Sequence, residues 1–182
     1  MINTRKIIPG IVVSLFALLP ITSWAAEELN IDFTYERNVN IGSISSVLSL
    51  PAFNDEREVS DKTLITDEYR AQKPLAEIVH DAFAQGFAKG GVDLVDSGED
   101  MQVVGTVTES GMEIVDRGGV QSIQLTIRAR IQLQNGGRTV WENTLFGRGT
   151  VPESEGVVAA VNASLERLVR ELFNDDYFII EL

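Results

Sequence analysis

Apolar and polar residues alternate most regularly between residues 120 and 134. Side chains alternate between the two faces of a β-strand, so this segment has one apolar face and one polar face. Asn135-Gly136-Gly137 follows as a turn, and residues 138–148 return as a second strand. The pattern predicts a long hairpin with one face towards a core. The apolar side begins at Gln121 and continues with Ile123, Leu125, Ile127, Ala129, Ile131 and Leu133.

A second periodicity, with apolar residues three and four positions apart, predicts two helices. The first opens at Lys73-Pro74 and ends at Gly90-Gly91, because proline suits a first helical turn and glycine a helix end. The second opens at residues 152–154 and ends at residues 174–176. The apolar stripes are Leu75, Ile78, Val79, Ala82, Phe83 and Phe87 in the first, and Val157, Val158, Val161, Leu165, Leu168, Val169, Leu172 and Phe173 in the second.

Shorter patterns complete the predicted order of elements. Residues 54–67 are charged and lack periodicity, which predicts a mobile surface connection. Strands that outnumber helices and are joined by tight turns favour an α+β fold, a two-layer sandwich with a mostly antiparallel sheet and two helices packed on one face. The other predicted strands are 29–35, 44–50, 92–95, 101–108, 112–115 and 177–182, with turns at 96–100, 109–111 and 116–119.

The first 25 residues have the pattern of a secretory signal peptide. Arg5 and Lys6 precede a largely apolar run, and Ser23-Trp24-Ala25 supplies the small residues of a cleavage site. A retained membrane anchor is the alternative, although Pro9 and Pro20 interrupt the run. We expect a single domain over residues 26–182, exported to the periplasm and without a stable membrane anchor after cleavage.

Charge and cysteine content narrow the function classes. The chain has 15 basic and 27 acidic residues, and loss of Arg5 and Lys6 leaves 13 basic residues and a net charge of −14. Nucleic-acid binding is therefore not expected, because phosphate contacts need net positive charge. The chain has no cysteine, which excludes disulfides, thiol chemistry and a lipid attached to cysteine.

Residues with the chemistry for catalysis are few. The single histidine, His80, lies off the apolar stripe of its helix; a catalytic base is the functional interpretation and a surface side chain the plain one. The carboxylates of 93–100 and of 55–61 lack the ligand spacing of a calcium loop. No Gly-x-Ser-x-Gly or phosphate-binding loop occurs. We therefore expect no catalytic residues, no metal and no cofactor, and an enzyme is the least favoured class.

The polar face of the long predicted strand carries the candidate contact residues. Arg128, Arg130 and Gln132 lie on it, and they form a patch for a protein partner or an anionic ligand unless the face is simply solvated. Trp141, on the returning strand, is the fourth candidate, with core or sheet-edge packing as the alternative.

Further motifs run over roughly residues 70–175. They are Leu75-x-Glu77-x-Val79 on a helix ending at Gly90-Gly91-Val92, the strand at 101–105, the hairpin 123–141 with its Gly-Arg-Gly exit, and Ala160-Val161-Asn162 in the second helix. Together with the export signal, these motifs resemble the YajG-like lipoproteins and, more distantly, LptE-like and transport-auxiliary lipoproteins. That resemblance implies a cell-envelope protein and no catalytic residues. Here the lipobox cysteine of those families is missing.

Two function classes are favoured over an enzyme. The first is a non-enzymatic periplasmic binding or assembly module that contacts an envelope protein through the polar face, the edge strands or residues 54–67. The alternative is a carrier of a small amphiphilic or lipid ligand held between helices and sheet. The partner's identity and a homo-oligomer are left open.

Overall fold

The computed structural model describes residues 25–41, 47–95 and 101–182. Most of the predicted signal segment, part of the strand expected at 44–50 and the turn expected at 96–100 lie outside these residues. None of the described helices is long and apolar enough to cross a membrane.

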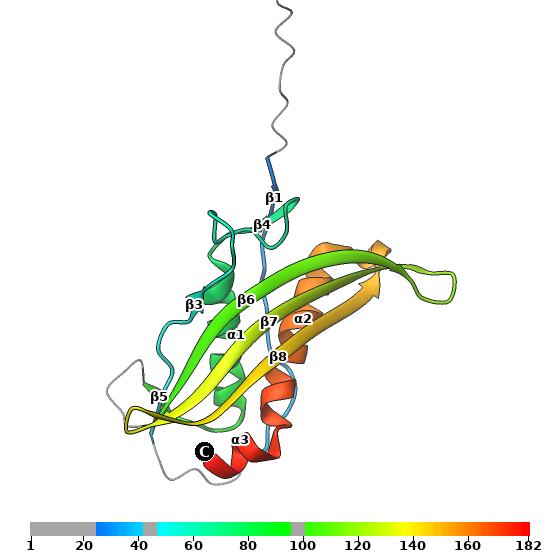
Figure 1. Ribbon diagram of the computed structural model, residues 1–182. Coiled ribbons are helices and arrows are strands. Elements are labelled where there is room, and N and C mark those ends of the chain that lie inside the picture. The colour runs from blue at the N-terminus through cyan, green and yellow to red at the C-terminus, as the bar shows by residue number, and fades with distance from the viewer. Residues whose placement is uncertain (1–24, 42–46, 96–100) are drawn as a thin grey trace, which may run out of the picture.

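Three long antiparallel strands form the centre of the molecule (Figure 1). They are β6 (Met101–Asp116), β7 (Gln121–Asn135) and β8 (Arg138–Pro152). Leu133 pairs with Val103 on one side and with Trp141 on the other. The apolar residues predicted for β7 are buried from Ile123 to Leu133, which confirms the hairpin and its core face. The return strand is four residues longer than predicted.

A β-bulge replaces the turn predicted at 109–111. β6 continues past this point, and the register shifts between Val107 and Glu109. The bulge adds one residue to β6, so Val107 and Ser110 both lie opposite core residues of β7, Ala129 and Ile127. The chain turns only after Asp116, where the N–H of Arg117 donates to the oxygen of Val120 at 2.9 Å.

Both long helices cover one face of this sheet (Figure 1), so the predicted α+β sandwich is confirmed. They are α1 (Leu75–Lys89) and α2 (Gly156–Phe173), the latter preceded by the 3-10 turn η1 (Glu153–Glu155). Ser164 of α2 donates to the oxygen of Gly147 in β8 at 2.6 Å. The helix lies directly on the strand because Gly147 and Gly149 present no side chain there.

Short parallel strands extend the sheet beyond β6. The order is β5-β2-β6-β7-β8, with β2 at Leu48–Ser49 and β5 at Leu94–Val95. β3 (Asn54–Asp55) pairs with Thr106 and Val107 of β6. A separate parallel pair joins β1 (Glu27–Leu29) to β4 (Tyr69–Ala71).

The strand predicted at 29–35 is wrong beyond Leu29. The burial alternates as expected, but side-chain amides take the place of a neighbouring strand. The N–H of Tyr35 donates to Oε1 of Gln85 at 2.9 Å, while Nε2 of Gln85 donates to the oxygen of Phe33 at 3.0 Å. Gln72 makes the same two contacts with the main chain of Ile31.

The closing strand predicted at 177–182 is also wrong, because this segment is the helix α3 (Asp176–Glu181). The side chain of Asp175 accepts from the N–H groups of Tyr177 and Phe178, which is the contact of a helix N-cap. Phe178 alone of its residues is buried, against Trp141 at a ring distance of 5.0 Å.

Candidate functional site

The face of the central sheet opposite the helices carries the predicted arginines, and each is paired with a carboxylate. Nη1 of Arg128 lies 2.6 Å from Oε2 of Glu109, and Nη2 of Arg130 lies 3.0 Å from Oε2 of Glu56. All four side chains are more than a third exposed, so each pair stabilises the fold only weakly. The two arginines are therefore accessible, but their charge is largely neutralised by neighbours.

Phe146 of β8 lies beside Arg128 on the same face. Its side chain is 46% exposed, and the guanidinium carbon of Arg128 lies 4.8 Å from the ring centroid. This is the geometry of a cation–π contact. Phe146 was not among the predicted contact residues, although alternation with buried Leu145 in β8 would have indicated an outward aromatic side chain.

The other two predicted contact residues, Gln132 and Trp141, lie on opposite faces of the sheet. Gln132 lies on the same open face and donates to Glu142. Trp141 lies on the helix face, only 9% exposed, and packs against Phe178 of α3. Its position matches the alternative of core packing, and it does not belong to a surface with Arg128, Arg130 and Gln132.

The side chain of His80 is 25% exposed, so it lies at the surface as expected but points partly into the protein. Its ring meets that of Phe53 edge-on at 5.4 Å, and Nε2 lies 3.1 Å from the oxygen of Leu50. The one carboxylate in contact with its ring among the described residues is Asp81, which also binds Lys73. Burial would raise the pKa of Asp81, but the hydrogen bonds and charges of Lys73 and His80 outweigh it and lower that pKa.

No group of three or more His, Asp or Glu side chains among the described residues is placed to hold a metal ion. The carboxylates predicted to lie in turns near residues 93–100 fall partly outside the described chain. Those of 55–61 are described, and Asp55 and Asp61 have specific partners within the protein.

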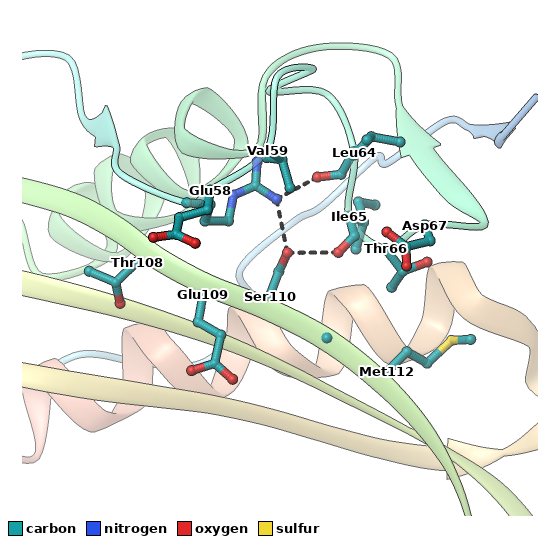
Figure 2. Close-up of a pocket in the computed structure, with 12 residues that line it drawn as sticks. Glu58, Val59, Leu64, Ile65, Thr66, Asp67, Thr108, Glu109, Ser110 and Met112 are labelled. Atoms are coloured by element: carbon teal, nitrogen blue, oxygen red, sulfur yellow. Dashed lines mark hydrogen bonds between the residues drawn. The ribbon is translucent and has the colours of Figure 1, made fainter.

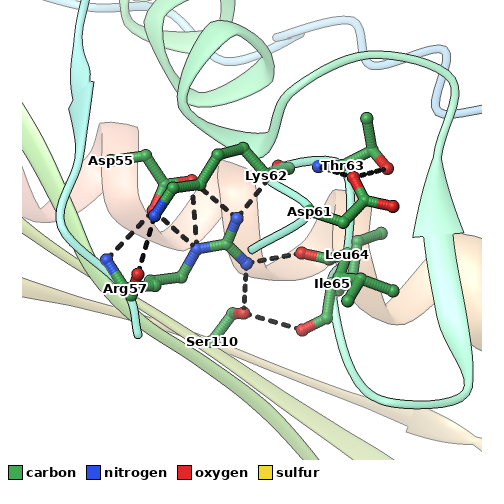
Figure 3. A network of polar contacts seen from close by, with 8 residues as sticks. All are labelled: Asp55, Arg57, Asp61, Lys62, Thr63, Leu64, Ile65 and Ser110. Atoms are coloured by element: carbon green, nitrogen blue, oxygen red, sulfur yellow. Dashed lines mark hydrogen bonds and ion pairs between the residues drawn. The ribbon is translucent and has the colours of Figure 1, made fainter. Parts of the chain in front are cut away.

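Residues 54–67 are not a simple surface connection, because a buried ion pair organises them (Figure 3). The side chains of Asp55 and Arg57 are 7% and 4% exposed and approach to 2.6 Å. The remaining guanidinium donors go to the oxygens of Leu64 and Lys62 and to Oγ of Ser110 in β6. All five N–H groups of Arg57 are thus used within the protein.

The arginine also fixes the ionisation of its partner. Burial would raise the pKa of Asp55, but the hydrogen bonds and positive charge of Arg57, with Lys62, outweigh it and lower that pKa. The pair is structural, since neither group has capacity left for a ligand. It holds the loop against Ser110, whose hydroxyl donates to the oxygen of Ile65 at 2.7 Å.

An open groove of about 540 Å³ lies between this loop and β6 (Figure 2). Its apolar lining comes from Val59, Leu64, Ile65 and Met112. Glu58, Asp67 and Glu109 add carboxylates to the lining. Sequence reasoning missed this groove because a charged, aperiodic segment carries no sign of which of its charges are buried.

The interface between α2 and β8 leaves no room for a ligand. A Cβ on Gly147 or Gly149 would come well under 3.0 Å from main-chain atoms of α2. Ala160, Ser164 and Leu168 fill the helix side of this contact. A carrier would therefore have to hold its amphiphile elsewhere.

Comparison with known proteins shows the fold but no family. No protein-family model and no curated protein matches the sequence. A Xanthomonas campestris protein assigned to the family model DUF330 is 14% identical, with a TM-score of 0.52 over 84% of this chain and 93% of that one. A hypothetical protein from Chlamydia trachomatis is 10% identical, with a TM-score of 0.50 over 76% of this chain and 100% of that one.

A minor lipoprotein from Acinetobacter baumannii is 14% identical, with a TM-score of 0.43 over 72% of this chain and 92% of that one. At these identities the first two matches establish a shared fold alone. The resemblance to YajG-like lipoproteins stays a prediction.

Proposed function

We propose that this protein is a non-enzymatic binding or assembly module of the bacterial cell envelope, acting in the periplasm after cleavage of its first 25 residues. The export pattern and the resemblance to YajG-like lipoproteins support this proposal. The partner is an envelope protein, bound through the open face of the central sheet.

The exposed pair of Arg128 and Phe146 carries the proposal. Arginine and aromatic residues supply a disproportionate share of the binding energy in protein interfaces, and here the two side chains are already stacked at 4.8 Å. Stacking reduces the conformational freedom that binding would otherwise remove. Arg130 and Gln132 extend the surface along β7, while buried Trp141 does not contribute.

The neutralised charges favour a protein over a small anionic ligand. An anion would have to compete with Glu109 for Arg128 and with Glu56 for Arg130. A protein surface instead adds apolar contact over Phe146 and polar contacts at the edges of the patch.

Site-specific photo-cross-linking in the periplasm tests the proposal. The full chain is exported with benzoylphenylalanine in place of Phe146 and, as a matched control, in place of Tyr177. Tyr177 is an aromatic residue that is 78% exposed, on α3 in the helix layer. We expect a discrete cross-linked product from position 146 that position 177 does not give.

The arginines decide whether that product reports the proposed surface. The double change Arg128→Glu and Arg130→Glu should remove it while the circular dichroism spectrum and thermal unfolding stay unchanged. A product of twice the chain mass would identify the partner as a second copy. A product that survives both charge reversals, or its absence from position 146, contradicts the proposal.

A further inference from the structure

The outer edge of β6 changes character along its length. β2 pairs with it at Gln102, and β3 pairs with it at Thr106 and Val107. The main-chain hydrogen bonds along this edge end where the N–H of Glu56 donates to the oxygen of Val107 at 2.9 Å. The loop then leaves the edge, and no described strand pairs with β6 from Glu109 to Asp116 on this side.

The direction of the main-chain groups along this free edge follows from the pairing. Opposed residues of an antiparallel pair turn their N–H and C=O groups either both towards or both away from the partner strand. The main-chain N–H and C=O groups of Val107 point away from β7, because its oxygen accepts from the N–H of Glu56. The main-chain groups of Ala129, which lies opposite Val107, therefore point away from β6. The main-chain groups of the preceding residue, Arg128, therefore point towards β6, where Glu109 lies opposite it after the bulge.

Alternation from Glu109 onwards leaves the main-chain groups of Ser110, Met112 and Ile114 pointing outward. Each carries one donor and one acceptor. Their side chains lie on the helix side of the sheet, since they are opposite Ile127, Leu125 and Ile123.

The groove lies directly beside this edge (Figure 2). Ser110, Gly111 and Met112 line it from β6, and Leu64 and Ile65 line it from the loop. A strand added antiparallel to β6 would place the side chains opposite Ser110 and Met112 into this groove, beside its apolar residues Leu64 and Ile65. Ile114, the next residue on that side, is 51% exposed and would extend the apolar contact.

The electrostatic environment of the edge is negative. Glu58 and Asp67 lie on the loop side of the groove, while Glu109 and exposed Glu113 lie on β6. Arg57, the basic residue of the groove lining, is already neutralised by Asp55. Arg128 pairs with Glu109 and so neutralises the charge of only that one carboxylate. Of these carboxylates, Glu109 and Glu113 lie on the open face of the sheet, opposite Arg128 and Gln124, so the residues of an added strand that face away from the groove meet them.

We propose that the free edge of β6 and its adjacent groove bind an extended segment of a partner protein as an added antiparallel strand, in which apolar residues alternate with lysine or arginine. Main-chain hydrogen bonds to Ser110, Met112 and Ile114 hold the strand, the apolar side chains fill the groove, and the basic ones face Glu109 and Glu113. This site adjoins the Phe146 surface through Glu109, the ion-pair partner of Arg128, but its main-chain contacts do not involve Phe146.

Fluorescence anisotropy with synthetic peptides tests the inference on the full chain. The probe is a labelled peptide of alternating valine and lysine, compared with one of alternating valine and glutamate. In the bound geometry the valines share a face with Met112, so their N–H groups point at β6. N-methylation of the valines should weaken binding by at least about tenfold, whereas N-methylation of the lysines should change it by less than about twofold.

Protein variants locate the site. Met112→Pro removes an outward N–H without touching the ladder to β7, and it should weaken binding by at least about tenfold. Thr144→Pro removes an outward N–H on β8, the opposite edge, and should leave binding unchanged. Glu113→Lys, which needs no backbone change, should weaken binding at low salt.

Each remaining outcome is decisive. No binding of the valine-lysine peptide at up to about 1 mM overturns the inference. Equal binding of the valine-glutamate peptide, or unchanged binding by both Met112→Pro and Glu113→Lys, does the same. Peptide binding that persists in Phe146→Ala separates this site from the surface in the proposed function.

Discussion

Gly149 of β8 lies directly under the main-chain oxygen of Ala160 in α2. A Cβ at this glycine would sit well under 3.0 Å from that oxygen and also crowd the N atom of Ser164. Main-chain atoms of a helix do not move aside as the end of a flexible side chain does. The spacing between the two layers of the sandwich is therefore set at this contact.

Gly149→Ala should lower the free energy of unfolding by about 2–3 kcal/mol, because the added methyl group forces α2 away from the sheet. Urea unfolding followed by circular dichroism measures the change. Gly111→Ala is the matched control, since it also lies in a strand but has nothing within 4 Å of an added Cβ. Equal effects at both positions would show that strand propensity, and not the layer contact, decides the loss.

Arg57→Met should destabilise the protein by about 3–5 kcal/mol, because it leaves the carboxylate of Asp55 buried without its counter-charge. Arg128→Met removes an arginine from an exposed pair and should cost less than about 1 kcal/mol. Chemical unfolding of both variants compares the pairs. A loss below 1 kcal/mol for Arg57→Met would contradict a structural role for the pair.

The stability of the protein should fall in acid partly through Asp55. Its pKa in the folded protein lies below the ordinary value of 3.8, so the pair contributes fully above that value and loses its contribution as pH falls through the folded pKa. Urea midpoints at neutral pH and between about pH 4 and 2 measure this. Asp55→Asn should be less stable at neutral pH and should show a smaller further loss in acid. Parallel pH profiles for the two proteins would exclude this contribution.

Gln85→Ala should release the segment around Tyr35, because it removes the donor to Phe33 and the acceptor from Tyr35. The expected loss of stability is about 1–2 kcal/mol, with faster hydrogen exchange at the Tyr35 amide. Gln132→Ala removes a glutamine whose contacts are with exposed Glu142 and with Gln134 on the open face, and it should change neither quantity. Unchanged exchange at Tyr35 in Gln85→Ala would show that burial alone holds this segment.

The parts of the fold that could be predicted are those in which one periodicity decides the structure. The alternation from Ile123 to Leu133 and the helical stripe from Leu75 to Phe87 both match the buried residues. The segment 177–182 is too short for periodicity to separate helix from strand, and the cap made by Asp175 decided in favour of a helix. At Glu109-Ser110-Gly111, polar residues suggested a turn, but the pairing to β7 continued through a bulge.

The candidate surfaces were predictable to a smaller extent, because they depend on contacts between distant residues. Arg128 and Arg130 were placed on the open face by alternation alone. Their neutralisation by Glu109 and Glu56 could not be predicted from the alternation, since Glu56 lies far from Arg130 along the chain. Arg57 gave no sign in the sequence that it would be buried, because burial of a charge depends on its partners.

The position of β6 in the sheet has a consequence for the order in which the chain folds. β2 and β3 pair with a strand that is synthesised after them, whereas β6, β7 and β8 are joined by tight turns and α2 follows immediately. Closing short loops costs less entropy than closing long ones, so we expect residues 101–173 to form first and the short strands β2 and β3 to pair with β6 afterwards. A chain that is made from its N-terminus therefore cannot complete this sheet until most of its length is available.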